Sequence, residues 1–111
     1  MAYGHLVGLL HKQGTFKDKE TGNQVAYDKI ECIILVRPKV GGNYEPVEAI
    51  GNDIVTVKDN KLISFDPRDI DSVFGRDVHC LDDCARFIDE DIEYYCDEKR
   101  RISKIILLNE E

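Results

Sequence analysis

Aromatic and basic side chains gather between positions 16 and 44 of the chain, in a pattern that could hold a single strand of nucleic acid. Aromatic rings stack on unpaired bases and nearby cations neutralise phosphates, so this combination needs no base-specific contact. Exposed lysine and tyrosine also occur on any solvated strand face, which leaves an ordinary surface as the alternative interpretation. The candidate binding residues are Phe16, Lys17, Lys19, Tyr27, Lys29, Arg37, Lys39 and Tyr44.

The elements that must position these residues begin with a predicted β-hairpin. Two aliphatic runs, 6–10 and 30–36, are typical of buried strands. The segment between them is charged and bounded by glycine, and it contains residue types that reverse the chain direction. These turn-forming residues are Asp18, Glu20, Gly22 and Asn23.

The second strand of this hairpin is predicted to present two different faces, because successive side chains of an extended segment alternate. The face expected to lie in the core carries Ala26, Ile30, Cys32, Ile34 and Val36. The opposite face is expected to form a mixed aromatic and basic surface beside the hairpin tip. It carries Tyr27, Lys29, Glu31 and Arg37.

The rest of the chain continues with short strands and one helix. A glycine-rich loop at 41–44 precedes a strand region at 47–57, and the turn at Asp59 and Asn60 leads into a strand at 62–65. A further extended piece is expected within 69–79, around Val73, Phe74 and Val78.

From Leu81 onward the apolar residues recur at helical spacing, which predicts a short helix over 82–89 with Asp82 as its cap. Beyond it, either the helix continues or a hairpin joins 92–96 to 102–108, and we favour the hairpin. A helix placed before the last strands of a strand-rich chain indicates a mainly β fold, a small OB-like five-stranded barrel. Residues 102–108 are apolar on both faces, as expected for a strand covered by the barrel and a second subunit, or by the helix alone.

Length and composition indicate one domain, 1–111, because 111 residues with 42% hydrophobic content can form a single core. Polar and glycine residues, among them His5, Gly8 and Lys12, interrupt the apolar start and argue against a signal peptide. No apolar run approaches the ~18 residues that cross a bilayer. We therefore expect a cytoplasmic protein, without a membrane partner, whose cysteines are thiols.

Charge is distributed unevenly along the chain. Residues 1–64 carry eight basic and eight acidic side chains, whereas residues 65–111 carry seven and fourteen and so account for the whole net charge of −7. An acidic total disfavours a nucleic-acid binder, yet affinity for phosphates depends on the local groups that meet them. The acidic segment 66–98 is thus a candidate surface for a protein partner.

Metal and catalytic chemistry have weaker support. His79, Cys80, Cys84 and Cys96 could be drawn into a zinc site, but no Cys-x-x-Cys pair occurs and buried thiols also serve as small hydrophobes. The acidic cluster at 89–93 could hold Mg²⁺, although runs of acids are more often solvated. We find no nucleophile elbow and no phosphate-cradling loop, so neither an enzyme nor a cofactor is expected.

Three segments carry a family resemblance: GTFKDKETG at 14–22, VAYD at 25–28 and DIEYYCDEKRRISKI at 91–105. They resemble small single-stranded-DNA-binding proteins of phages and mobile elements, a group similar to the filamentous-phage helix-destabilising protein family. The resemblance implies an OB-like barrel, often a homodimer, whose basic and aromatic hairpins wrap a DNA strand without base readout. The competing hypothesis is an acidic protein-interaction module or DNA mimic of a phage or mobile element, which works through segment 66–98 and does not bind nucleic acid.

Overall fold

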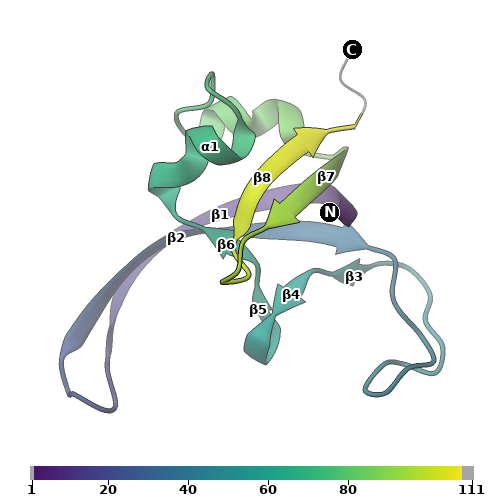
Figure 1. The fold of residues 1–111 in the computed structure, drawn as a ribbon, viewed down its shortest axis with the longest axis horizontal. Coiled ribbons are helices and arrows are strands. Elements are labelled where there is room, and N and C mark those ends of the chain that lie inside the picture. The colour runs from purple at the N-terminus through teal and green to yellow at the C-terminus, as the bar shows by residue number, and fades with distance from the viewer. Residues whose placement is uncertain (1, 109–111) are drawn as a thin grey trace.

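A long antiparallel hairpin dominates the computed structural model, which describes residues 2–108 (Figure 1). Its strands are β1 (Ala2–Lys17) and β2 (Gln24–Val36), and their register runs from the pair His5 and Leu35 to the pair Lys17 and Gln24. At the tip, the Asp18 N–H donates to the carbonyl of Asn23 and the Gly22 N–H donates to the carbonyl of Asp18, both at 2.8 Å. The predicted hairpin and its turn are confirmed.

The main sheet is antiparallel, and its hydrogen-bonded order is β3-β2-β1-β7-β8, with β6 also paired to β2. Two further short strands, β4 and β5, pair with each other around a turn in which Asp59 and Asn60 both have positive φ. The predicted terminal hairpin is confirmed as β7 and β8. The bounds are β3 Asp53–Ile54, β4 Thr56–Val57, η1 Lys58–Asn60, β5 Lys61–Leu62, β6 Ser64–Phe65, β7 Glu90–Cys96 and β8 Ile102–Leu107.

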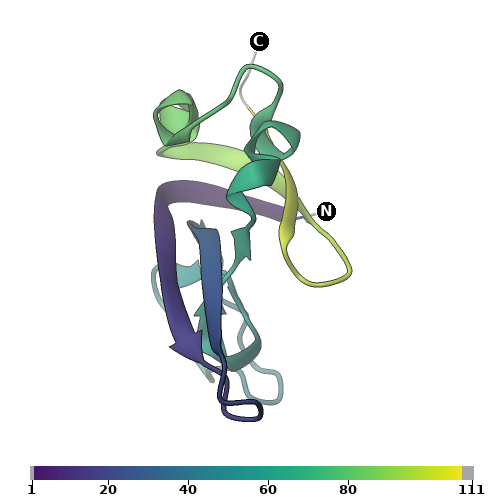
Figure 2. The same cartoon turned by 90° about the vertical axis from the view of Figure 1, so that its left-hand side faces the viewer.

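Strand β1 divides into two parts with different surroundings. Residues 2–6 pair with β7 on one side, and two of them, His5 and Leu6, also pair with β2 on the other. The register with β2 shifts between Leu6 and Gly8, and the outer part of β1 then pairs with β2 alone. The outer hairpin projects away from the body of the sheet, as Figures 1 and 2 show.

The core lies between the inner sheet and two short helices. Phe74 of α1 (Ile70–Phe74) packs edge-on against Phe65 and against Phe87 of η3 (Leu81–Phe87), with ring centroids 5.7 and 4.8 Å apart. Such edge-to-face packing suits the ring quadrupoles. The largest fully buried side chains are Phe65, Phe87, Leu6, Ile34, Ile92, Val73, Val78, Cys32 and Cys84.

The helical region corrects two predictions. A helix forms close to 82–89, but it is a 3-10 helix over 81–87, and its N-cap is Cys80 without a side-chain cap from Asp82. The expected extended piece within 69–79 is wrong, because this segment contains α1. The preceding turn η2 (Pro67–Asp69) starts this helical stretch, since proline fixes φ and the Arg68 N–H donates to the Asp66 carboxylate.

Three strand predictions also need correction. Segment 47–52 belongs to an exposed loop, and strand structure begins at Asp53. Ala26 is exposed, because the projecting part of the hairpin has no third layer to cover it. Glu31 is buried, although we expected it on the open face.

The hydrogen-bonded path ends at β3 and β8 without joining them, so no closed barrel is seen in residues 2–108. The mainly β prediction is confirmed, and the barrel remains a prediction. Within the same residues, no helix has the length and apolar character needed to cross a membrane.

Gly4 offers a test of how tightly β1 packs under β2. A Cβ atom at Gly4 would lie 2.5 Å from Cγ2 of Ile34 and 3.1 Å from the carbonyl oxygen of Leu35. We expect Gly4→Ala to lower the free energy of unfolding by about 1–3 kcal/mol, the usual cost of overpacking, in urea denaturation. Gly8→Ala is the control, because its Cβ would meet the flexible end of Ile33 at 3.3 Å. Equal losses in both variants would contradict the packing described.

Candidate nucleic-acid interface

A pocket of about 390 Å³ lies on the outer part of the hairpin, and it combines lysine amines with aromatic rings. The pairing of Lys12 with Lys29 and of Phe16 with Val25 puts these side chains on one face of the two strands. β5 adds one more lysine from outside the hairpin. The lining residues are Lys12, Phe16, Tyr27, Lys29 and Lys61.

The two rings of this pocket are held open to solvent. Phe16 is 53% exposed and Tyr27 is 38% exposed, and their centroids lie 6.4 Å apart with the planes tilted by 35°. The Tyr27 ring lies against the backbone of Gly14, where an added Cβ would meet the Tyr27 Oη at 2.5 Å. Glycine at this position therefore lets the ring rest on the strand. Lys29 Nζ lies 5.7 Å from the Tyr27 ring centroid, within range of a cation–π interaction.

Glu31 sits beneath the lysines and fixes two of them. Its side chain is 8% exposed, and its two oxygens lie 2.6 Å from Lys12 Nζ and 3.5 Å from Lys29 Nζ. The interaction with Lys12, more than the one with Lys29, lowers the pKa of Glu31. Lys61 has no ion-pair partner among residues 2–108. The lining carries three amines, and Glu31 neutralises only one of their three charges, so the pocket keeps a net positive charge.

These groups can hold a phosphodiester chain and its bases together. Amines a few ångströms apart neutralise neighbouring phosphates, while exposed rings offer faces on which bases stack. The pocket volume falls within the range of ordinary ligand sites, large enough for a nucleotide unit. Its lining of three lysines and two aromatic residues suits it to binding such a chain.

The structure distributes the eight predicted residues over three places. Phe16, Tyr27 and Lys29 meet in the hairpin pocket. A second pocket, of about 380 Å³, has Arg37, Lys39 and Tyr44 in its lining. Lys17 ends β1 and pairs with Gln24, and Lys19 lies in the turn, so both belong to the hairpin tip outside the two pockets.

Sequence reasoning missed two lysines of the hairpin pocket. Lys12 could have been found, because it lies four residues before Phe16 and so shares its face in an extended strand. Lys61 follows the predicted turn at Asp59 and Asn60, but nothing in the sequence indicates that this turn folds against the hairpin. The position of Lys61 in the pocket depends on contacts between segments that are distant in the sequence.

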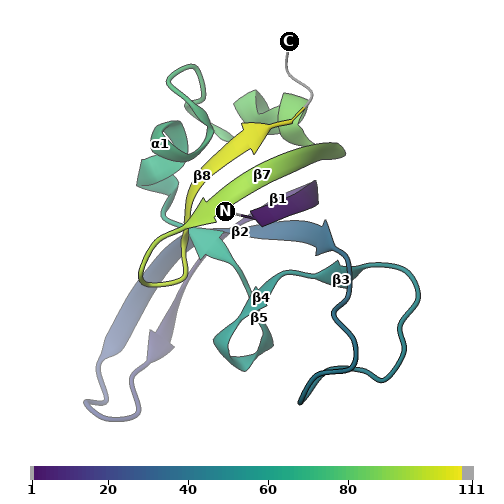
Figure 3. The same cartoon turned by 45° about the vertical axis from the view of Figure 1, so that its right-hand side comes forward.

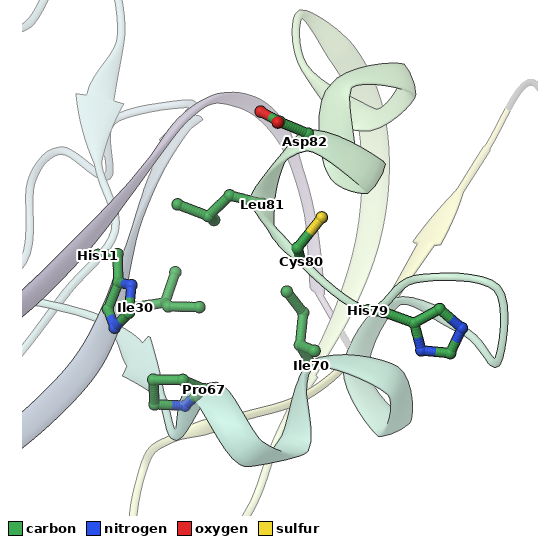
Figure 4. A pocket seen from close by; sticks show the side chains of 8 residues that line it. All are labelled: His11, Ile30, Pro67, Ile70, His79, Cys80, Leu81 and Asp82. Carbon is green, nitrogen blue, oxygen red and sulfur yellow. The ribbon is translucent and has the colours of Figure 1, made fainter.

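A third cavity, of about 370 Å³, lies under the opposite face of the hairpin, with His11 and Cys80 in its wall (Figure 4). The side chains of His79 and Asp82 point away from its centre and do not converge with Cys80. Across residues 2–108 no group of three or more His, Cys, Asp or Glu side chains is placed to hold a metal ion. The zinc arrangement that the spacing allows is therefore not assembled.

All four cysteines are free thiols. Burial raises the pKa of Cys32 to about 12 and that of Cys84 to about 11. Because the thiolate is the nucleophile and the metal ligand, these two side chains are inert packing groups at neutral pH.

No protein-family model, no curated protein and no solved structure matches this chain.

The buried carboxylate of Glu31 predicts a specific pH dependence. Lys12 and Lys29 lower its pKa below the ordinary 4.5, so its contribution to stability is complete above that value and is lost as the pH falls through the folded-state pKa. We expect Glu31→Gln to lower the free energy of unfolding by about 1 kcal/mol at pH 7, with the deficit shrinking in acid. Urea titrations between pH 7 and pH 3 measure this. A deficit independent of pH would contradict the ion pairs.

Proposed function

We propose that this protein binds a single strand of nucleic acid without reading its sequence. The observation that carries the proposal is the hairpin pocket, in which three lysines and two exposed rings share one face. The rings offer flat faces and the amines are compact cations on flexible stems, so neither group imposes a base-specific geometry. Stacking and phosphate neutralisation tolerate any base, which fits binding without sequence preference.

The placement of the acidic residues supports the same proposal. The acidic half of the sequence contributes α1, η3 and β7, and the helices lie at the end of the molecule opposite the hairpin tip (Figures 1 and 2). Their carboxylates therefore do not surround the hairpin pocket. Repulsion between a phosphate chain and distant carboxylates is screened over about 8–10 Å at physiological ionic strength.

The strand order agrees with a partly open barrel of the OB type, which we propose as the fold. Along the chain, α1 and η3 lie between β6 and the terminal hairpin of β7 and β8. β6, which pairs with β2, also contacts β8. Phe65 of β6 and Ile105 of β8 belong to the same core. The resemblance to phage and mobile-element single-stranded-DNA-binding proteins supports this assignment, and a homodimer remains a prediction.

Salt-dependent binding tests the electrostatic part of the proposal. A labelled oligothymidine, followed by fluorescence anisotropy, should bind with log K falling linearly against log salt, by about 0.7 per phosphate neutralised. Lys61→Glu should weaken binding about tenfold and reduce that slope, because Lys61 has no carboxylate partner within residues 2–108. A matched oligouridine tells whether the strand is DNA or RNA.

The control for this experiment is Lys104→Glu, which makes the same charge change at an exposed position of β8. It should bind like the parent protein. If the parent fails to bind at low salt, or if the two variants lose affinity equally, the proposal is refuted and the acidic side becomes the surface to test with proteins.

Stacking is tested separately with Tyr27→Leu. Loss of one base–aromatic contact costs roughly 1–3 kcal/mol, so the affinity should fall about 5- to 150-fold. The salt slope should stay unchanged, because no phosphate contact is removed. Anisotropy titrations at three salt concentrations separate the two effects. Unchanged affinity would exclude Tyr27 from the binding surface.

A further inference from the structure

The second pocket resembles the hairpin pocket in chemistry although it is built from different elements. It contains the cations of Arg37 and Lys39 together with Tyr44, which is fully exposed. Tyr44 has a φ of 64°, a strained conformation for a residue with a side chain, and it is held out into solvent. Two cations and a free ring are again the groups that meet phosphates and bases.

The two carboxylates of this pocket are engaged by the backbone. Glu45 accepts a hydrogen bond from the Gly42 N–H at 3.1 Å, and Asp53 accepts one from the Ile54 N–H at 2.8 Å. No ion pair ties either of them to Arg37 or Lys39 among residues 2–108. The cations are therefore available to a ligand.

The small β4–β5 hairpin connects the two pockets. Thr56 of β4 lines the second pocket, and Lys61 of β5 lines the hairpin pocket. Thr56 pairs with Leu62 and Val57 pairs with Lys61, so the two linings come from opposite faces of one pair of short strands. Lys58, in the turn between them, is exposed and adds another cation.

All three segments project from the same side of the molecule. Figures 1 and 3 show the β1–β2 hairpin, the β4–β5 hairpin and loop 37–52 extending away from the sheet body, with α1 and η3 on the opposite side. This arrangement gives one side of the protein two pockets that each contain cations and an exposed aromatic ring, with Lys58 exposed in the turn between them.

We infer that a single strand of nucleic acid runs along this side, from the hairpin pocket across the β4–β5 hairpin to the pocket of Arg37, Lys39 and Tyr44. The inference rests on the proposed function and extends it, because it assigns a second binding subsite and an upper limit to the number of nucleotides that one molecule contacts. At about 3.4 Å per nucleotide, a stacked strand crosses the 43 Å longest dimension of the molecule with at most about 12 nucleotides. Four stacked nucleotides extend about 14 Å at the same rise, and we expect them to occupy one pocket at a time.

The test compares labelled oligothymidines of 4, 12 and 20 nucleotides by anisotropy. The affinity should rise at least tenfold from 4 to 12 nucleotides and change little per binding site from 12 to 20. The double variant Arg37→Glu with Lys39→Glu should weaken binding of the 12-mer and reduce its salt slope by about 1.4, which corresponds to two phosphates. It should leave any binding of the 4-mer unchanged, since the hairpin pocket remains intact.

The charge-matched control is the double variant Arg76→Glu with Lys104→Glu, which alters exposed cations on the acidic half. If the 12-mer binds both double variants equally well while Lys61→Glu still weakens it, the second subsite is wrong and the hairpin pocket alone binds the strand. Equal affinity for the 4-mer and the 12-mer would also overturn the inference. Absence of binding at every length would instead refute the proposed function.

Discussion

The structure depends on strand β1, which pairs with two neighbouring strands, β2 and β7. Residues 2–6 of β1 pair with β7, and His5 and Leu6 pair with β2 as well, so this segment joins the terminal hairpin to the rest of the sheet. Gly4 lies in this segment, where the close approach of Ile34 and of the Leu35 carbonyl leaves no room for a side chain. After the register shift near Gly8, β1 is free to leave the body with β2 and to carry the binding groups outward.

The positions of the charged residues follow from the same division of β1 into an inner part and an outer part. In the outer hairpin both faces are accessible, and lysines can be placed there at low cost in desolvation. Glu31 lies where the hairpin enters the body, and its burial is compatible with charge because Lys12 and Lys29 reach it from the solvent side. The carboxylate thus orders two lysines that would otherwise lose conformational freedom on meeting a ligand.

Local patterns in the sequence predict the parts of the fold that depend on near neighbours. The alternation around Ile30 and the turn residues Asp18 and Gly22 define the long hairpin, and the same reasoning places β7 and β8. Segment 69–79 was predicted wrongly because Val73, Phe74 and Val78 are too few to distinguish the strand period from the helical one. Lys61 and the burial of Glu31 depend on contacts between distant segments, which no single-sequence pattern contains.

The projecting hairpin gives the molecule two regions of unequal stability. The radius of gyration is 15.6 Å, above the ~13 Å of a compact chain of this length, because the outer hairpin has no third strand and little apolar cover. Local opening from the tip therefore breaks few contacts, whereas opening of residues 2–6 requires loss of the core. Backbone amide hydrogens near the tip should exchange with solvent through local fraying. The outer hairpin can therefore change its shape while the body of the sheet stays folded.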